Sequence, residues 1–255
     1  VGDYATDATY GAENVWSMFE AVWHMNESPT GEVLDSTGNG NNATSSGSMT
    51  DSDVVSGQVG NSIDFDAVDD ILTAGSNVTF SDYYMSAWIA PESSGEGNVG
   101  RIVNYGSLDT FISTTNRFWH ESVFSGGAAD WTSDSGSLVY NGNFNHVVAQ
   151  RGDVYSTATY ATIYQNNIKY TPNASPSAAL TATTSISIGN NNIQARTFDG
   201  RLDEIRLAST TVSDAWVSAE YENQKNTSTF YSVVSSMEAQ VSVWNATDWT
   251  LYDTI

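Results

Sequence analysis

Short stretches in which apolar and polar residues alternate recur along most of this chain. Within Asn61–Asp66, Ile63 and Phe65 alternate with polar residues, and Thr159–Tyr164 shows a similar pattern. A period of two places successive side chains on opposite faces of a β-strand. Clusters of Gly, Ser, Asn and Asp separate these stretches and are typical of turns. The pattern predicts about twelve to fourteen strands, as expected for two antiparallel sheets packed face to face.

One segment follows a helical pattern instead. We predict a short helix near residues 213–223, where Ser213 can cap the N-terminus and Asp214 favours the positive end of the helix dipole. Val217 and Tyr221 lie four residues apart, on one face of such a helix, and are expected to pack against the sandwich. The strands and this helix together predict an all-β sandwich with one short helix near its C-terminal end.

Composition and charge narrow the classes of partner. The chain has 255 residues and a formal net charge of −22, with 30 acidic and only 8 basic residues. Such a surface repels phosphate backbones, so nucleic acid is not an expected partner, and strongly anionic polysaccharides are disfavoured for the same reason. There is no cysteine, which excludes disulfides and thiol chemistry. No apolar stretch approaches the roughly 20 residues of a membrane span, so no membrane insertion is expected.

A series of motifs resembles the laminin-G-like domains of the concanavalin A-like lectin/glucanase superfamily, which are jelly-roll sandwiches. Seven pieces occur in the order expected for that family: Trp23–Glu27, Asp35–Asn41, Gly60–Asp66 with Asp69 and Asp70, Met85–Ile89, Phe144–Val147, Ile163–Asn167 and Asp199–Arg206. Two turn positions, Ala67 and Asn167, depart from the glycine that is usual in the family. The resemblance implies a jelly-roll sandwich used mostly to bind glycans and less often to catalyse.

The resemblance also divides the chain into three parts. Residues 20–232 are expected to form the laminin-G-like domain. Residues 1–19 read as an extension or the tail of a preceding β module, and residues 233–255 as a C-terminal β segment or the start of a following domain. The chain is therefore expected to be a secreted or cell-surface protein, with neighbouring domains of a larger protein or self-assembly as further partners.

A calcium ion is the cofactor that the resemblance implies, because family members often hold a structural Ca²⁺ near the first of these loops and the Asp-Glu strand. Hard cations take carboxylate, amide and carbonyl oxygens. The expected ligands are Asp35, Asn39, Asn41 and Asp203. In the alternative interpretation, these side chains only cap turns and accept backbone hydrogen bonds.

The adjacent carboxylates of the Asp-Glu strand do not suggest catalysis. Neighbouring residues on a strand point to opposite faces, so Asp203 and Glu204 cannot flank one bond. Glu204 and Arg206 share a face and are expected to form an ion pair. We therefore nominate no catalytic residue.

Aromatic residues supply the candidate ligand-binding site. Sugars present C–H faces that stack on aromatic rings, while polar side chains bind their hydroxyls. The expected ligand-binding residues are Trp131, Trp119, Tyr83 and the neighbouring Asp82. Trp131 lies at the centre of a Gly-rich loop and is expected to be exposed, whereas a core position is the alternative for Trp119. The remaining tryptophans considered are expected to be packing residues: Trp23, Trp88 and Trp216.

These features favour a non-catalytic binding module that recognises a neutral glycan or a glycosylated surface and carries a structural calcium ion. The first alternative is a structural subunit of an extracellular filament, sheath or surface layer, because turn-rich termini suit head-to-tail assembly. The second alternative is a glycan-active enzyme, which needs two carboxylates in one cleft.

Overall fold

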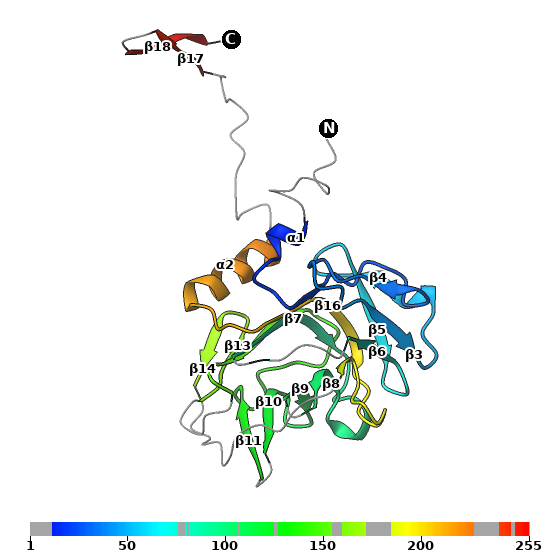
Figure 1. The fold of residues 1–255 in the computed structure, drawn as a ribbon. Helices are drawn as coiled ribbons and strands as arrows, with labels where there is room; N and C mark the ends of the chain where they lie inside the picture. The colour runs from blue at the N-terminus through cyan, green and yellow to red at the C-terminus, as the bar shows by residue number, and fades with distance from the viewer. Residues whose placement is uncertain are drawn as a thin grey trace. The chain divides into compact units, whose positions relative to one another are not determined.

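The structure is a computed structural model that describes residues 12–75, 80, 82–106, 108–124, 127–154, 160–171, 185–226, 240–245 and 248–254. The predicted fold class is confirmed, because β-strands predominate over helices among the described residues and form two large antiparallel sheets. The chain divides into two compact units, residues 1–221 and 222–255. The first contains the sandwich (Figure 1).

Each sheet of the sandwich has eight strands. Sheet A runs in the order β14 (Ile168–Tyr170), β13 (Thr162–Gln165), β12 (Asn145–Arg151), β7 (Tyr83–Pro91), β16 (Asp199–Ala208), β5 (Asn61–Asp66) and β4 (Val54–Ser56), and β1 (Ala21–Trp23) also pairs with β16. Sheet B runs in the order β11 (Gly127–Thr132), β10 (Arg117–Phe124), β9 (Leu108–Ser113), β8 (Arg101–Tyr105), β15 (Ile186–Ile188), β6 (Ile71–Ala74), β3 (Ala43–Ser46) and β2 (Glu32–Val33).

Helices are short and few among the described residues. They comprise the α-helices α1 (Ala12–Val15) and α2 (Asp214–Lys225), and the 3₁₀ turns η2 (Asp51–Asp53) and η3 (Glu96–Asn98). The second compact unit contains a hairpin of β17 (Gln240–Asn245) and β18 (Asp248–Thr254). None of the described helices has the length and apolar character that crossing a membrane requires.

Alternating strand residues from both sheets fill the space between the sheets. The main cluster includes the fully buried residues Trp23, Ile63, Met85, Ile112 and Phe118. A second apolar cluster covers the opposite side of sheet A, where Val217 of α2 packs with Tyr84, Val148 and Tyr164. Figure 1 shows α2 along the side of the sandwich formed by β7 and β13, whereas β9, β10 and β11 lie at the side away from α2.

The predicted helix and its packing face are confirmed, with one correction. Val217 is fully buried and Tyr221 is 8% exposed, as the four-residue spacing indicates. Trp216, expected to pack, is 43% exposed, because it precedes Val217 and so faces away from the sheet. Trp23 and Trp88 are buried, as expected.

The two departures from the family's glycine pattern occupy turns with a left-handed backbone. Ala67 has a φ of 63° and Asn167 a φ of 65°, next to Asn166 with a φ of 49°. Asn166 and Asn167 join β13 to β14 in a two-residue hairpin turn, in agreement with the turn position expected at Asn167. Asn adopts this conformation more readily than most residues because its short polar side chain hydrogen-bonds locally.

Candidate functional site

An aromatic pair lies on the face of sheet B that points away from the core. Phe118 and Ile112 point into the core, so the alternation of β9 and β10 turns Phe111 and Trp119 to the outer face. Their rings stack with centroids 5.5 Å apart. Phe111 is nearly covered, whereas Trp119 is only partly buried and keeps an accessible surface.

Two polar contacts hold this aromatic pair in place. The guanidinium carbon of Arg101 lies 4.2 Å from the centre of the Phe111 ring, in cation–π geometry. The indole N–H of Trp119 donates to the hydroxyl of Ser113 at 2.9 Å. Trp119 is therefore fixed before any ligand arrives, which lowers the entropic cost of binding.

A row of carboxylates crosses three strands on the same outer face. Glu121 is the register partner of Asp109 on one side and of Asp130 on the other. Arg101 lies 3.1 Å from Asp109 and 3.9 Å from Glu121. Burial raises the pKa of all three carboxyls, and for Glu121 repulsion from the other two adds to the effect. These oxygens are acceptors for sugar hydroxyls.

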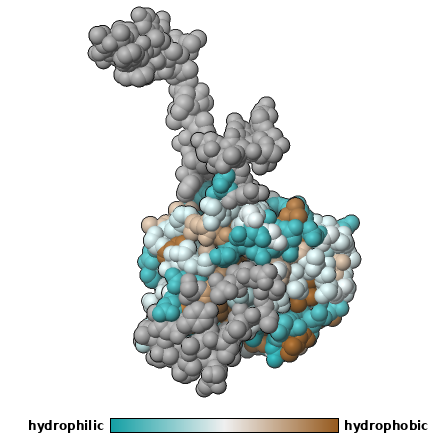
Figure 2. Space-filling model, viewed as in Figure 1, coloured by the Kyte–Doolittle hydropathy of each residue, from teal (hydrophilic) through white to brown (hydrophobic). Residues whose placement is uncertain are grey.

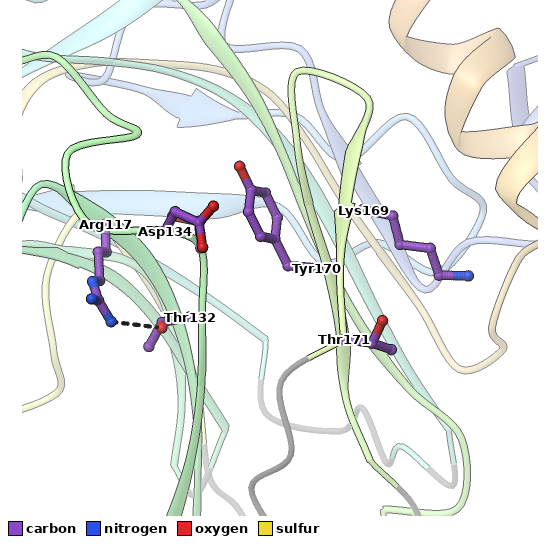
Figure 3. Close-up of a pocket in the computed structure, with 7 residues that line it drawn as sticks. Arg117, Thr132, Asp134, Lys169, Tyr170 and Thr171 are labelled. Atoms are coloured by element: carbon purple, nitrogen blue, oxygen red, sulfur yellow. Dashed lines mark hydrogen bonds between the residues drawn. The ribbon is translucent and has the colours of Figure 1, made fainter.

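A polar pocket of about 420 Å³ opens beside this face (Figure 3). Its volume falls within the range of about 300–1,000 Å³ that is usual for small-molecule sites. It is lined by Arg117, Thr132, Ser133, Asp134, Lys169, Tyr170 and Thr171. The partly buried ring of Tyr170 supplies an apolar surface, and the other groups supply hydrogen-bond donors and acceptors.

The pocket lies where an edge of each sheet meets the other. Thr132 is the register partner of Trp119, and Arg117 lies two residues before Trp119 on β10, so all three share the outer face. Lys169 and Tyr170 come from β14, the edge strand of sheet A. The aromatic pair and the pocket therefore form one continuous candidate site. We call it the sheet B site, and we define it by Arg101, Phe111, Arg117, Trp119, Thr132 and Tyr170.

Two of the predicted ligand-binding aromatics prove to be core residues. Trp131 and Tyr83 are both fully buried and stack on opposite sides of His120, at centroid distances of 5.6 Å and 5.3 Å. The expected placement of Trp131 on an exposed loop is wrong because its Gly-rich segment forms strand β11, whose alternation turns Trp131 inward and Thr132 outward. Tyr83 begins β7, a strand buried along its whole length.

The other two predicted ligand-binding residues keep some exposure. Trp119 belongs to the sheet B site, as described. Asp82 is partly buried, and its Oδ1 accepts the backbone N–H of Asp153 at 2.7 Å. Asp82 does not line the pocket.

Asp35 uses both carboxylate oxygens to bind its own loop and strand β1. Oδ1 accepts the backbone N–H groups of Val22 at 3.0 Å and Thr37 at 2.9 Å. Oδ2 accepts the Thr37 hydroxyl at 2.7 Å and the backbone N–H of Asn41 at 2.9 Å. These four donors satisfy the charge without a cation.

The two asparagines of this loop also bind the protein through their amide nitrogens. Asn39 and Asn41 donate to the carbonyl oxygen of Glu20, at 3.1 Å and 2.8 Å. Together with the four donors on Asp35, these contacts give the loop a structural role, so this part of the expected calcium ligand set does not require an ion.

Asp203 is a better fit for a cation than the loop residues. Its Oδ2 accepts the backbone N–H groups of Gln58 at 2.8 Å and Val59 at 2.9 Å, whereas the buried Oδ1 has no hydrogen-bond partner among the described residues. Burial, reinforced by the neighbouring charge of Glu204, raises the pKa of Asp203 to about 7. A buried carboxylate oxygen of this kind is stabilised either by a proton or by a cation.

The regular alternation expected for the Asp-Glu strand is interrupted by a β-bulge between Asp203 and Arg206, where Glu204 has a φ of 49°. Glu204 points away from the Asp203 contacts and pairs with Arg206 at 2.6 Å and with His24 at 2.6 Å. The predicted ion pair between Glu204 and Arg206 is confirmed.

Several members of the sheet B site were missed by sequence reasoning. Arg117 and Tyr170 of the site are 53 positions apart in the chain, and the neighbouring carboxylates Asp109, Glu121 and Asp130 lie on three different strands. Part of the site could have been predicted from the alternation in Arg117–Phe124, which places Arg117, Trp119 and Glu121 on one face of the strand. Their proximity to Thr132 and Tyr170 depends on strand order.

Comparison with known proteins agrees with this architecture. A sequence profile described as the concanavalin A-like lectin/glucanases superfamily matches residues 65–218. The chain belongs to the concanavalin A-like lectin/glucanase superfamily. No curated protein matches the sequence.

Solved structures share the fold of this superfamily member at low sequence identity. The binding domain of botulinum neurotoxin serotype D matches with a TM-score of 0.61 and 14% identity, over 82% of this chain and 53% of the toxin domain. The binding domain of the Paraclostridial mosquitocidal protein 1 matches with a TM-score of 0.59 and 14% identity, over 80% of this chain and 52% of that domain. This chain therefore spans about half the length of these toxin domains.

A third match covers a complete domain. Domain 4 of an extracellular arabinanase from Geobacillus stearothermophilus, solved in complex with arabinotriose, matches with a TM-score of 0.54 and 16% identity, over 78% of this chain and 96% of that domain. The structural neighbours are thus carbohydrate-binding and receptor-binding domains.

Proposed function

We propose that this chain is an extracellular, non-catalytic module that binds a neutral glycan at the sheet B site and holds a structural Ca²⁺ at Asp203. The observation that carries the proposal is the preorganised, partly accessible Trp119 on the outer face of sheet B, next to a polar pocket. An aromatic platform beside hydroxyl-binding groups is the usual arrangement of a sugar site. The family and the binding-domain neighbours support the same class of function.

The position of the site supports a binding role for the glycan rather than a structural one. Trp119 and the pocket lie on the outer face of sheet B, whereas α2 and its apolar contacts cover the outer face of sheet A. A glycan on sheet B therefore does not compete with the packing of α2. On the view in Figure 2, apolar residues form separate patches among polar ones.

The test is a binding measurement that compares two tryptophans. A panel of neutral oligosaccharides, with arabinotriose included, is screened by calorimetry against the wild type, Trp119→Ala and Trp216→Ala. Loss of a stacked aromatic is expected to weaken binding about tenfold, the equivalent of roughly 1.4 kcal/mol, in Trp119→Ala. Trp216→Ala removes the exposed tryptophan of α2 and is expected to bind like the wild type.

Two results would count against the proposal. Equal affinity of Trp119→Ala and the wild type, with both proteins folded, removes Trp119 from the site. Absence of any saccharide binding by the wild type removes the glycan from the proposal.

The β17–β18 hairpin favours a second candidate function, a structural subunit that assembles through its C-terminal unit. A two-stranded sheet is marginally stable on its own in water. Such a hairpin gains stability by pairing with further strands, as in β-augmentation.

A further inference from the structure

We infer that the pocket at the edge of the sheet B site binds a sugar residue that carries one carboxylate, with Arg117 as the group that recognises the charge. This inference deepens the proposed function and rests on it, because it names the terminal residue of a glycan whose neutral part lies along the same face. It rests on the bonding of Arg117, the composition of the pocket and the charge balance of the chain.

Arg117 lacks the carboxylate partner that three other cations of this protein have. Arg101 pairs with Asp109, Arg206 with Glu204, and Lys169 with Asp214. In the described part of the chain, Arg117, Arg196 and Arg201 form no ion pair with a carboxylate, although acidic residues outnumber basic ones by 30 to 8. Arg196 and Arg201 donate to backbone carbonyl oxygens, and of the three only Arg117 lines the pocket. An arginine without an acidic partner in so acidic a protein points to an anionic ligand.

The donors of Arg117 are only partly used by the protein. One terminal nitrogen donates to the Thr132 hydroxyl at 3.2 Å, which orients the guanidinium group in the pocket (Figure 3). The buried Nε has no hydrogen-bond partner. Guanidinium groups bind carboxylates through two parallel hydrogen bonds, and such charge-assisted bonds are about twice as strong as neutral ones. A sugar carboxylate would pair with the terminal guanidinium donors that Thr132 leaves free, because the buried Nε is out of reach of a ligand.

The remaining lining groups fit the body of a sugar rather than a bare anion. Tyr170 extends from β14 toward Asp134 and offers its ring to a C–H face (Figure 3). Thr171 and Asp134 are exposed and supply oxygen atoms to hydroxyl groups. Lys169 points away from Tyr170, and its amine is held by Asp214 at 2.8 Å.

The charge balance limits the ligand to a single negative charge. Only Arg117 is a free cation among the described lining residues, and Asp134 contributes a negative charge to the same pocket. The net charge of −22 repels polyanions over distances of about a Debye length, roughly 8 Å at physiological ionic strength. A terminal uronic or sialic acid type of residue meets these limits, and a sulfated polymer does not.

The experiment measures three matched sugars by titration calorimetry and ligand-observed NMR. Glucuronic acid, its methyl ester and glucose differ only around one carboxyl group, and sodium acetate tests a carboxylate without a sugar. The proteins are the full chain, Arg117→Gln and Arg117→Lys, with thermal unfolding as the check of folding. The wild type is expected to bind the acid about tenfold more tightly than the ester or glucose, with little response to acetate.

The variants separate charge from geometry. Arg117→Gln is expected to bind acid and ester equally, whereas Arg117→Lys is expected to keep part of the preference, because an ammonium group carries the charge without the planar fork. Equal binding of acid and ester by the wild type, or an unchanged preference in folded Arg117→Gln, would overturn the inference.

Binding of a neutral oligosaccharide, if Trp119 is required for it, distinguishes the proposed function from the Arg117 inference. If that oligosaccharide binds and the carboxylate adds nothing, the Arg117 inference fails and the proposed function stands. If neither neutral nor acidic sugars bind, both fail. If acidic sugars bind only through Arg117, the inference stands and the neutral-glycan assignment fails.

Discussion

Asp203 and Asp35 show how similar side chains acquire different roles from their surroundings. Asp35 accepts four hydrogen bonds on its two oxygens, from its own loop and from strand β1. Asp203 accepts two backbone N–H groups of the loop at Gln58 and Val59 on Oδ2 and leaves Oδ1 buried and unused. Hard cations take carboxylate oxygens at distances of about 2.3–2.6 Å. The proposed Ca²⁺ site is therefore centred on Asp203.

Removal of this carboxylate should abolish stabilisation by calcium. The unfolding midpoint of the wild type is expected to rise on replacement of EDTA by 1 mM Ca²⁺, because a ligand that binds only the native state stabilises it by mass action. Asp203→Asn is expected to give equal midpoints in both conditions. Thermal unfolding by circular dichroism measures the shift.

Asp35→Asn is the matched control. It weakens a loop carboxylate that is already satisfied, so its midpoint is expected to fall while its response to Ca²⁺ is kept. If Ca²⁺ raises the unfolding midpoint of Asp203→Asn as much as that of the wild type, the proposed Ca²⁺ site at Asp203 is contradicted. If Ca²⁺ no longer raises the midpoint of Asp35→Asn, Asp35 is a Ca²⁺ ligand after all.

Helix α2 is held on sheet A by a buried carboxylate as well as by apolar packing. Glu220 accepts the hydroxyls of Tyr84 at 2.5 Å and Ser86 at 2.6 Å, and lies 3.4 Å from Arg206 and 3.6 Å from His146. Burial opposes the ionisation of Glu220, but these hydrogen bonds and positive charges outweigh it and lower its pKa to about 2. The docking of α2 is therefore linked to pH.

The stability that Glu220 contributes should disappear in acid. Because its pKa is lowered from 4.5 to about 2 on folding, this contribution is complete above about pH 4.5 and is lost as the pH falls toward 2. Glu220→Gln is expected to unfold at a lower temperature than the wild type at pH 7, with a loss of roughly 1–3 kcal/mol, and this difference should shrink between pH 4.5 and 3.

The exposed Glu222 on the same helix provides the control. Glu222→Gln is expected to follow the wild type across the whole pH range. A gap between Glu220→Gln and the wild type that stays constant down to pH 3 would show that Glu220 does not hold α2 through its charge.

The two compact units of this chain are required by different candidate functions. The sandwich occupies residues 1–221 and contains the sheet B site and Asp203, while the β17–β18 hairpin belongs to residues 222–255. A binding module requires only the first unit, whereas assembly through the hairpin requires the second. The two candidate functions therefore depend on different parts of the chain.

Truncation after Asn226 should separate the two functions. The shortened chain keeps all sixteen strands of the sandwich, so its unfolding midpoint and its glycan affinity are expected to equal those of the full chain. Size-exclusion chromatography with light scattering compares the oligomeric states. If the full chain forms polymers that truncation abolishes, and no glycan binds, the structural function replaces the binding function.

Much of this architecture can be predicted from local sequence patterns, because period-two alternation and turn residues act over a few positions. The strand at Asn61–Asp66, the hairpin turn at Asn166 and Asn167, and the helix with Val217 on its buried face all follow from such patterns. The order of the seven motifs is what identifies the family from the sequence. The ion pair of Glu204 with Arg206 was expected from strand alternation and is present, although a β-bulge at Glu204 interrupts that alternation.

The sheet B site depends on contacts that local patterns do not encode. Alternation divides Trp131 and Thr132 between two faces, but it does not say which face the other sheet covers, so Trp131 was placed outside and Trp216 inside. Arg117 and Tyr170 line one pocket because β10 lies next to β11, the edge strand of sheet B, and β14 is the edge strand of sheet A, which is a property of strand order. The backbone donors to Asp203 Oδ2 likewise come from a loop more than 140 positions earlier in the chain. Local patterns specify the elements and their two faces, whereas long-range packing specifies which of these faces remain open to a ligand.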